Sequence, residues 1–158
     1  VVALYTYLLE QDISAFQRFD EGTAAAGIDV LFNNSFDDLI FARGNPTVAA
    51  EVRTRAILAI KNLYSGVFEK RCLPILSHLD ERPTSRLNSV CYMLWDVCPL
   101  GHVSPDTENA SQSEIGAILE VLEFALQSSN DACIESALHG LGHAPDPTPP
   151  GPSRRITG

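Results

Sequence analysis

Apolar residues recur along this chain at the spacing of an α-helix, and no stretch alternates convincingly with the two-residue period of a strand. The clearest stripe consists of Leu87, Val90, Cys91, Leu94 and Cys98, which occupy positions i, i+3, i+4, i+7 and i+11 on one helical face. The pattern predicts an all-α fold. Further stripes with the same period are Phe68, Cys72, Ile75, Leu76 and Leu79; Ile115, Ile118, Leu119, Leu122 and Leu126; and Ile134, Ala137, Leu138 and Leu141.

Helix start and stop signals separate these stripes. Asn45 and Pro46 supply a capping side chain and a first-turn proline for one helix, which Ser65 and Gly66 are expected to close. Ser85 is expected to lie at the start of a later helix that ends before a proline. Together the signals predict helices near residues 1–19, 29–42, 47–64, 66–79, 84–97, 112–128 and 131–142.

The sequence predicts one folded domain followed by an irregular tail. With 158 residues, of which 45% are hydrophobic, the chain can bury one sizeable core without disulfide bonds. Residues 1–143 carry the helical stripes and form the predicted domain. Residues 144–158 are rich in proline, which lacks a backbone N–H and clashes with the preceding helical turn. This tail is therefore expected to be extended or disordered.

The formal net charge of −9 restricts the classes of partner. Proteins that bind nucleic-acid phosphates use lysine and arginine to displace counterions, so neither DNA nor RNA is an expected partner. The same charge opposes binding to an anionic membrane, and no run of 18 apolar residues could span one. The expected partner is a protein or peptide, which could be basic.

The cysteines, Cys72, Cys91, Cys98 and Cys133, are even in number but do not form a loop framework. Each lies inside or at the end of an apolar helical pattern, where free cysteine is commonly buried. They are therefore expected to be reduced core residues of a cytoplasmic protein. No basic segment followed by an apolar stretch marks a secretory signal near Val1.

Three of the predicted helices share a frame in which Ala56, Ser89 and Ala137 superpose. In the first of them, Val52 and Arg53 precede small residues at helical spacing. This arrangement resembles the second helix of HEAT repeats, in which small residues let neighbouring helices approach closely. The aligned segments are 51–60, 84–93 and 132–141.

Segment 72–80 is similar to a first HEAT helix, with a proline near its start and an acid at its end. By this resemblance, Arg53 and Arg86 would bond to acids in the turns of the stack, whereas the matching position of the third helix holds Ile134. The resemblance covers residues 47–143 and implies a short right-handed α-solenoid of HEAT-like helical hairpins with an N-terminal capping helix. Such families mostly bind partners, so it also implies a binding scaffold.

The sharpest candidate for a chemical site is the set Glu135, His139 and His143, at positions i, i+4 and i+8 of the last predicted helix. Two histidines at this spacing can share a divalent metal ion, and a nearby carboxylate can complete the site. A metal- or cofactor-dependent enzyme on a HEAT-like scaffold is therefore the alternative function. In the favoured interpretation, His139 packs between helices, His143 helps to terminate its helix, and no cofactor is expected.

Aromatic residues are frequent before residue 45, and Phe32 and Phe36 are one helical turn apart. If both lay outside the core, they would form an apolar patch suited to a partner or to a second copy of the chain. Plain core packing is the favoured alternative. A homo-oligomer of the chain is therefore a further option.

Signals for catalysis are missing from the sequence. There is no Gly-x-Ser-x-Gly elbow, and the cysteines lie in buried patterns rather than beside a base. Gly140 and Gly142 lie inside a helical pattern, which favours close packing over a phosphate-binding turn. The sequence therefore favours a non-catalytic scaffold that binds a protein or peptide.

Overall fold

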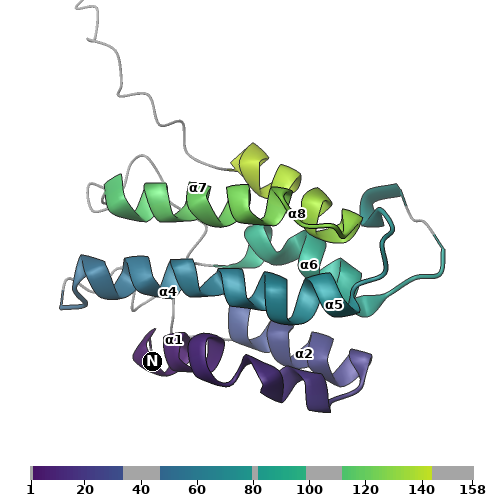
Figure 1. Cartoon of the computed structure of the whole chain (residues 1–158), viewed down its shortest axis with the longest axis horizontal. Coiled ribbons are helices and arrows are strands. Elements are labelled where there is room, and N and C mark those ends of the chain that lie inside the picture. The colour runs from purple at the N-terminus through teal and green to yellow at the C-terminus, as the bar shows by residue number, and fades with distance from the viewer. Residues whose placement is uncertain (1, 34–46, 80–81, 99–111, 144–158) are drawn as a thin grey trace, which may run out of the picture.

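The computed structural model describes residues 2–33, 47–79, 82–98 and 112–143, and every regular element within these ranges is a helix (Figure 1). The all-α prediction is therefore confirmed for this part of the chain. The predicted tail at 144–158 lies outside the described residues. The α-helices are α1 (Val2–Gln11), α2 (Glu21–Phe32), α4 (Ala50–Leu63), α5 (Glu69–Arg71), α6 (Arg86–Val97), α7 (Gln112–Leu126) and α8 (Asp131–His143), with 3-10 helices η1 (Ile13–Arg18) and η3 (Ser77–Leu79) and the π-helix η2 (Tyr64–Phe68).

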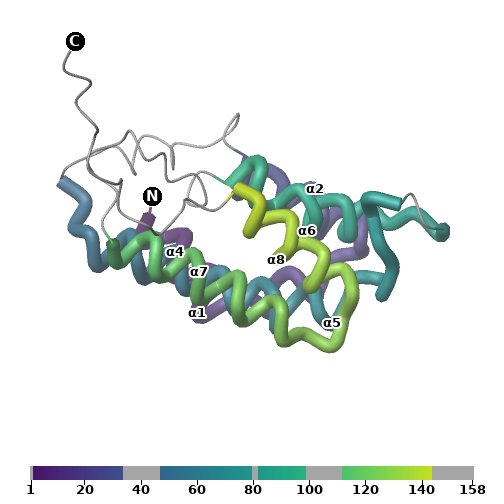
Figure 2. Tube along the Cα trace, turned by 90° about the horizontal axis from the view of Figure 1, so that it is seen from above, coloured from purple at the N-terminus to yellow at the C-terminus, as the bar shows by residue number. Residues whose placement is uncertain are grey.

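The helices form two layers, which Figure 2 shows from above. In one layer, α4 packs between α1 and α7, and in the other α6 packs between α2 and α8. Contacts between α7 and α8 join the layers at one end of the stack. In the described part of the chain, no helix combines the length and apolar composition needed to cross a bilayer.

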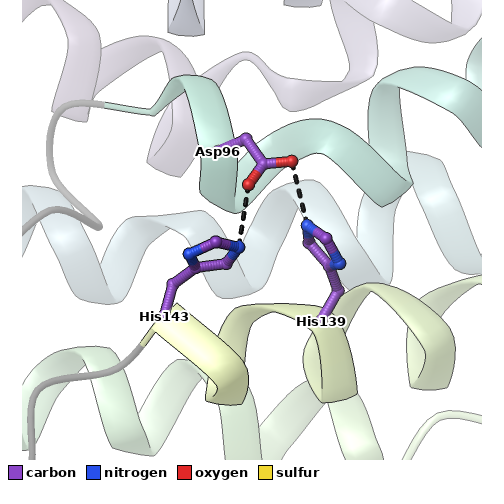
Figure 3. Close-up of side chains that lie close together, drawn as sticks. All are labelled: Asp96, His139 and His143. Atoms are coloured by element: carbon purple, nitrogen blue, oxygen red, sulfur yellow. Dashed lines mark hydrogen bonds and ion pairs between the residues drawn. The ribbon is translucent and has the colours of Figure 1, made fainter.

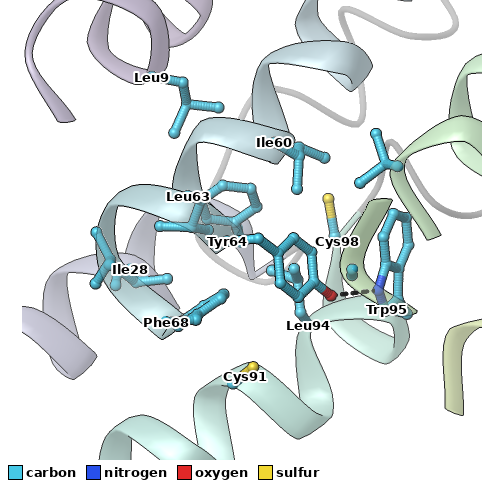
Figure 4. Packing of buried hydrophobic residues seen from close by; sticks show 14 of the residues in the cluster. Leu9, Ile28, Ile60, Leu63, Tyr64, Phe68, Cys91, Leu94, Trp95 and Cys98 are labelled. Carbon is cyan, nitrogen blue, oxygen red and sulfur yellow. Dashed lines mark hydrogen bonds between the residues drawn. The ribbon is translucent and has the colours of Figure 1, made fainter. Parts of the chain in front are cut away.

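The core lies between the two layers, and its central residues are drawn in Figure 4. Each large apolar side chain that is fully buried contributes about 1.5–3 kcal/mol to the free energy of folding. All four cysteines are buried free thiols, as the sequence predicts, and burial raises the pKa of the Cys91 thiol well above its ordinary value. The largest fully buried side chains are Tyr64, Phe32, Phe68, Leu9, Ile28, Ile60, Leu63, Leu87, Leu94, Ile118 and Leu122.

The predicted helix at 1–19 is wrong beyond Gln11, where the α-helix ends and a separate 3-10 helix follows. The predicted helix start at residue 29 is also wrong, because α2 begins at Glu21 and ends at Phe32, and residues 34–42 of the predicted helix lie outside the described residues. The start of α2 is set by Asp20, whose carboxylate accepts a hydrogen bond from the Thr23 backbone N–H at 2.9 Å. By contrast, the predicted helix start near Ser85 is confirmed, since the Ser85 side chain caps α6 by accepting a hydrogen bond from the Asn88 N–H.

The predicted helix end at Ser65 and Gly66 is wrong, because the chain continues through the π-helix into α5. A Cβ atom on Gly66 would lie 3.0 Å from the Ile13 side chain, so this glycine allows η1 to pack against the π-helix. The predicted helix at 66–79 ends early, at Arg71. Cys72 is already extended, and the proline that follows at position 74 prevents further helix.

The three helices that carry Ala56, Ser89 and Ala137 do not lie in the same layer, contrary to the frame that superposes them. The helix containing Ala56 lies beside α1 and α7, whereas the other two helices lie in the opposite layer. Ala56 and Ala137 are fully buried, but Ser89 is exposed. The frame therefore identifies close-packed positions correctly on two helices and misplaces the third.

The arginines of that frame also differ from the expectation. Arg53 forms a largely buried ion pair with Glu114 of α7, and it donates a further hydrogen bond to the Val48 carbonyl. Arg86 is exposed. Arg53 thus joins neighbouring helices within one layer instead of bonding to an acid in a turn.

Candidate functional site

A buried chain of hydrogen bonds joins α6, α8 and the π-helix. The Trp95 indole N–H donates to the Tyr64 hydroxyl at 2.8 Å, as Figure 4 shows, and this hydroxyl lies 2.8 Å from the Ser136 hydroxyl. Ser136 in turn donates to the Cys91 carbonyl. Each donor in this series of hydrogen bonds has an acceptor, so these polar groups are buried without loss of hydrogen bonding. Burial also raises the pKa of Tyr64 well above its ordinary value.

Gly140 lets α8 approach this junction closely. A Cβ atom at this position would lie 2.6 Å from Trp95 Cδ1 and 2.7 Å from Leu122 Cδ2, distances at which atoms clash. The close-packing interpretation of the glycine is confirmed here. It is wrong for Gly142, where a Cβ atom would meet nothing within 4 Å.

This packing places Asp96, in the last turn of α6, opposite His139 and His143 on α8 (Figure 3). His139 Nε2 lies 2.9 Å from one carboxylate oxygen of Asp96, and His143 Nε2 lies 2.9 Å from the other. One donor atom from each of these residues lies within 4.8 Å of the other two. We call the three residues the Asp–His–His cluster. Their side chains are between 23% and 44% exposed.

Neighbouring rings hold the imidazoles in place. The Tyr92 ring packs on His139 with 4.4 Å between the ring centroids. His139 and His143 meet edge to face at 5.0 Å. The orientation of His139 is therefore fixed on two sides by aromatic contact as well as by its bond to Asp96.

Glu135 does not join the two histidines, contrary to the sequence prediction. It is buried and accepts hydrogen bonds from the backbone N–H groups of Ser77 at 2.8 Å and His78 at 2.9 Å. Its carboxylate also contacts the His78 ring. Residues four apart on a helix differ in direction by about 40°, so over two turns Glu135 and His143 diverge by about 80°. The two ends of the set therefore meet different neighbours.

A groove adjoins the cluster, with a cavity volume of about 320 Å³ between α6, α8 and the segment that leads into η3. Leu138, which the sequence stripe places in the core, is instead 58% exposed beside it, and Leu141 is also exposed. We call this feature the α6–α8 groove. Its lining residues are Leu76, His78, Tyr92, Asp131, Ile134, Glu135, Leu138 and His139.

Phe32, one of the two residues of the alternative apolar patch, does not lie on the surface. Phe32 is fully buried and packs edge to face on Tyr5, with 5.0 Å between the ring centroids. Phe36 lies outside the described residues. The favoured core interpretation is thus confirmed for Phe32.

A second cavity, of about 430 Å³, lies between α1 and α4 and is lined by Tyr7, Glu10 and Arg55 among others. Glu10 and Arg55 pair through two hydrogen bonds, and the Arg55 guanidinium lowers the pKa of the Glu10 carboxyl. The two oppositely charged side chains that line this cavity therefore bond to each other. The α6–α8 groove, by contrast, adjoins a cluster of three donor residues.

Asp96 and Tyr92 are site residues that the sequence analysis missed. An acid in the last turn of a helix opposes the helix dipole, which favours cations at that end. The unfavourable position of Asp96 was therefore the available signal that residues from another helix would stabilise its charge.

Comparisons with models of protein families, with curated proteins and with solved structures find no match to the chain.

Proposed function

We propose that the chain is a HEAT-like helical-repeat scaffold that binds a segment of a partner protein in the α6–α8 groove. The order of the helices supports the repeat architecture. The successive pairs are α1 with α2, α4 with α6, and α7 with α8, and in each pair the first helix lies in one layer and the second in the other. Three such levels match the number that usually suffices to bury a continuous seam in a short solenoid. The proposal includes a right-handed superhelix, as the resemblance to HEAT repeats implies.

The single observation that carries the binding proposal is the exposure of Leu138 beside a groove with apolar walls. Leu76 and Ile134 line the same groove, so an apolar side chain of a partner could be buried against three aliphatic residues. Large apolar side chains gathered on one exposed face mark interaction surfaces.

The charges beside the groove favour a basic segment. Asp131, which lines the groove, is exposed at the start of α8. The whole chain carries a formal charge of −9, which attracts a cationic partner over a longer range. The proposed occupant is therefore a short segment of a protein in which apolar residues are flanked by lysine or arginine.

Synthetic peptides of matched length test this proposal. One peptide combines leucine with lysine, the other combines leucine with glutamate, and binding of each to the full chain is measured by titration calorimetry. We expect the lysine peptide to bind, with an affinity that falls as salt is added, and the glutamate peptide not to bind.

Variants then locate the binding site. Leu138→Ser removes an apolar contact that the bound peptide would bury, worth about 1.5–3 kcal/mol. It should weaken binding of the lysine peptide roughly tenfold or more. Leu4→Ser is the matched control, because Leu4 is 73% exposed on α1. Equal affinities for the wild type and the Leu138→Ser variant would refute the proposal. A dimer of the chain that Leu138→Ser dissolves, seen by sedimentation, would identify a second copy as the occupant instead.

A further inference from the structure

The Asp–His–His cluster has a chemistry that partner binding in the groove does not use. We propose that Asp96, His139 and His143 bind a single divalent first-row transition-metal ion, with Zn²⁺ as the reference ion. The inference goes beyond the scaffold function and does not depend on it. It rests on the donor set, its geometry and the rigidity of the elements that carry it.

The donor set fits this class of ion. Imidazole nitrogen and carboxylate oxygen are ligands for zinc and for other divalent ions of the first transition series, whereas calcium and magnesium prefer oxygen alone. Two histidines one helical turn apart supply the nitrogens, and Asp96 supplies oxygen from a neighbouring helix. Three protein ligands on two packed helices form the minimum of a zinc site with an open position.

The donor atoms lie close enough to gather around one ion, since all three are within 4.8 Å of one another. Each histidine Nε2 lies 2.9 Å from an oxygen of Asp96. Ligands that surround a tetrahedral ion at about 2.0–2.1 Å are roughly 3.3 Å from one another. At these nitrogen–oxygen pairs an ion requires shifts of only a few tenths of an ångström. Donor pairs that are further apart, up to the 4.8 Å limit, must close to the same separation when the ion binds.

The positions of the donors are set by packing. Gly140 lies between the two histidines and packs against Trp95, the residue that precedes Asp96. The Tyr92 ring packs against His139, in addition to the contacts of His139 with His143 and Asp96. Donors held on packed helices keep their geometry better than donors on loops, so less free energy is spent on ordering them when the ion binds.

The cluster is open to solvent on one side. His143 is 44% exposed, and Asp96 and His139 are about one quarter exposed. An ion can reach the three donors without local unfolding, and a fourth ligand can come from water. Because His139 also lines the α6–α8 groove, that open position lies near the surface proposed for a partner.

A second histidine–carboxylate pair provides the matched control. His78 contacts Glu135, but this carboxylate already accepts hydrogen bonds from two backbone N–H groups. Among the described residues, the pair does not belong to a group of three donors within coordinating distance. His78 therefore tests whether any surface histidine beside an acid binds the ion.

The test uses the untagged full chain after treatment with a chelator. Zn²⁺ is titrated by calorimetry, and Co²⁺ by the visible absorption of its bound form. We expect one equivalent of Zn²⁺ to bind with a dissociation constant below about 10 μM. Asp96→Asn, His139→Gln and His143→Gln should each weaken binding by about tenfold or more, whereas His78→Gln should bind like the wild type.

Circular dichroism establishes that each variant is folded, and Asp96→Asn keeps the size of the side chain if a histidine variant fails to fold. X-ray absorption of the zinc complex should show nitrogen and oxygen neighbours. Failure of the wild type to bind either ion would overturn the proposal, as would undiminished binding in all three variants. Sulfur neighbours would overturn it too, because they would assign the ion to the buried cysteines.

Discussion

Among single residues, Gly140 sets the distance between α6 and α8. It is the point at which the indole of Trp95 and the side chain of Leu122 meet the backbone of α8. A larger residue would push the helices apart and would move both histidines away from Asp96. The geometry of the candidate site thus depends on a residue that carries no functional group.

Gly140→Ala should lower the free energy of unfolding by about 1–3 kcal/mol, because the added methyl group overpacks a filled space. Gly142→Ala lies two residues further along the same helix, where space is open, and should raise stability by about 0.5–1 kcal/mol through helix propensity. Urea unfolding of the two variants measures both effects. Equal stabilities would contradict the close approach of α8 to Trp95.

The residues of the site were partly predictable from sequence. Helical spacing alone places His139 and His143 on one face of α8, and the structure confirms that they lie together. The pairing of the histidines with Asp96 could not be predicted from local sequence, because Asp96 lies 43 residues before His139 and meets it only through tertiary packing. Glu135 shows the converse error, in which a residue close in the sequence binds a different neighbour.

The start of α6 was predictable from sequence, because Ser85 marks it as expected. Two other boundaries were missed: α2 begins after the cap at Asp20, and the helix predicted at 66–79 ends at Arg71, before the proline at position 74. The π-helix at Tyr64–Phe68 was not predictable from the apolar period, because it widens a turn without breaking the pattern. It allows α4 to continue into α5, where two shorter helices were expected.

Tyr64, at the start of the π-helix, supports a prediction for this element. Tyr64→Phe would leave the Trp95 N–H without its acceptor and remove a hydrogen bond to Ser136, at a cost of about 1–3 kcal/mol. Tyr7→Phe, at an exposed position of α1, should change stability by less than about 0.5 kcal/mol. Thermal and urea unfolding would measure the difference. Indistinguishable variants would mean that the hydrogen-bonded junction adds nothing to stability.

For the whole molecule, the sequence predicted the class of fold but not the assignment of helices to layers. An amphipathic stripe says which face of a helix is buried and does not say which helix covers it. On α8, Ala137 of the predicted stripe is buried, but Leu138 and Leu141 of the same stripe are exposed. Ser136 and Gly140 are buried in their place. The small residues face α6 and the core, which leaves both leucines exposed, with Leu138 beside the groove.

Binding of a partner segment to this exposed face can be mapped by the chemical shifts of the backbone amides. Backbone amide spectra of the ¹⁵N-labelled chain are recorded while the leucine–lysine peptide is added. We expect the largest shifts at residues 76–78, at Tyr92 and along 131–139, which line the α6–α8 groove. Shifts concentrated at the cavity between α1 and α4, or spread over the acidic surface without a centre, would contradict binding in this groove.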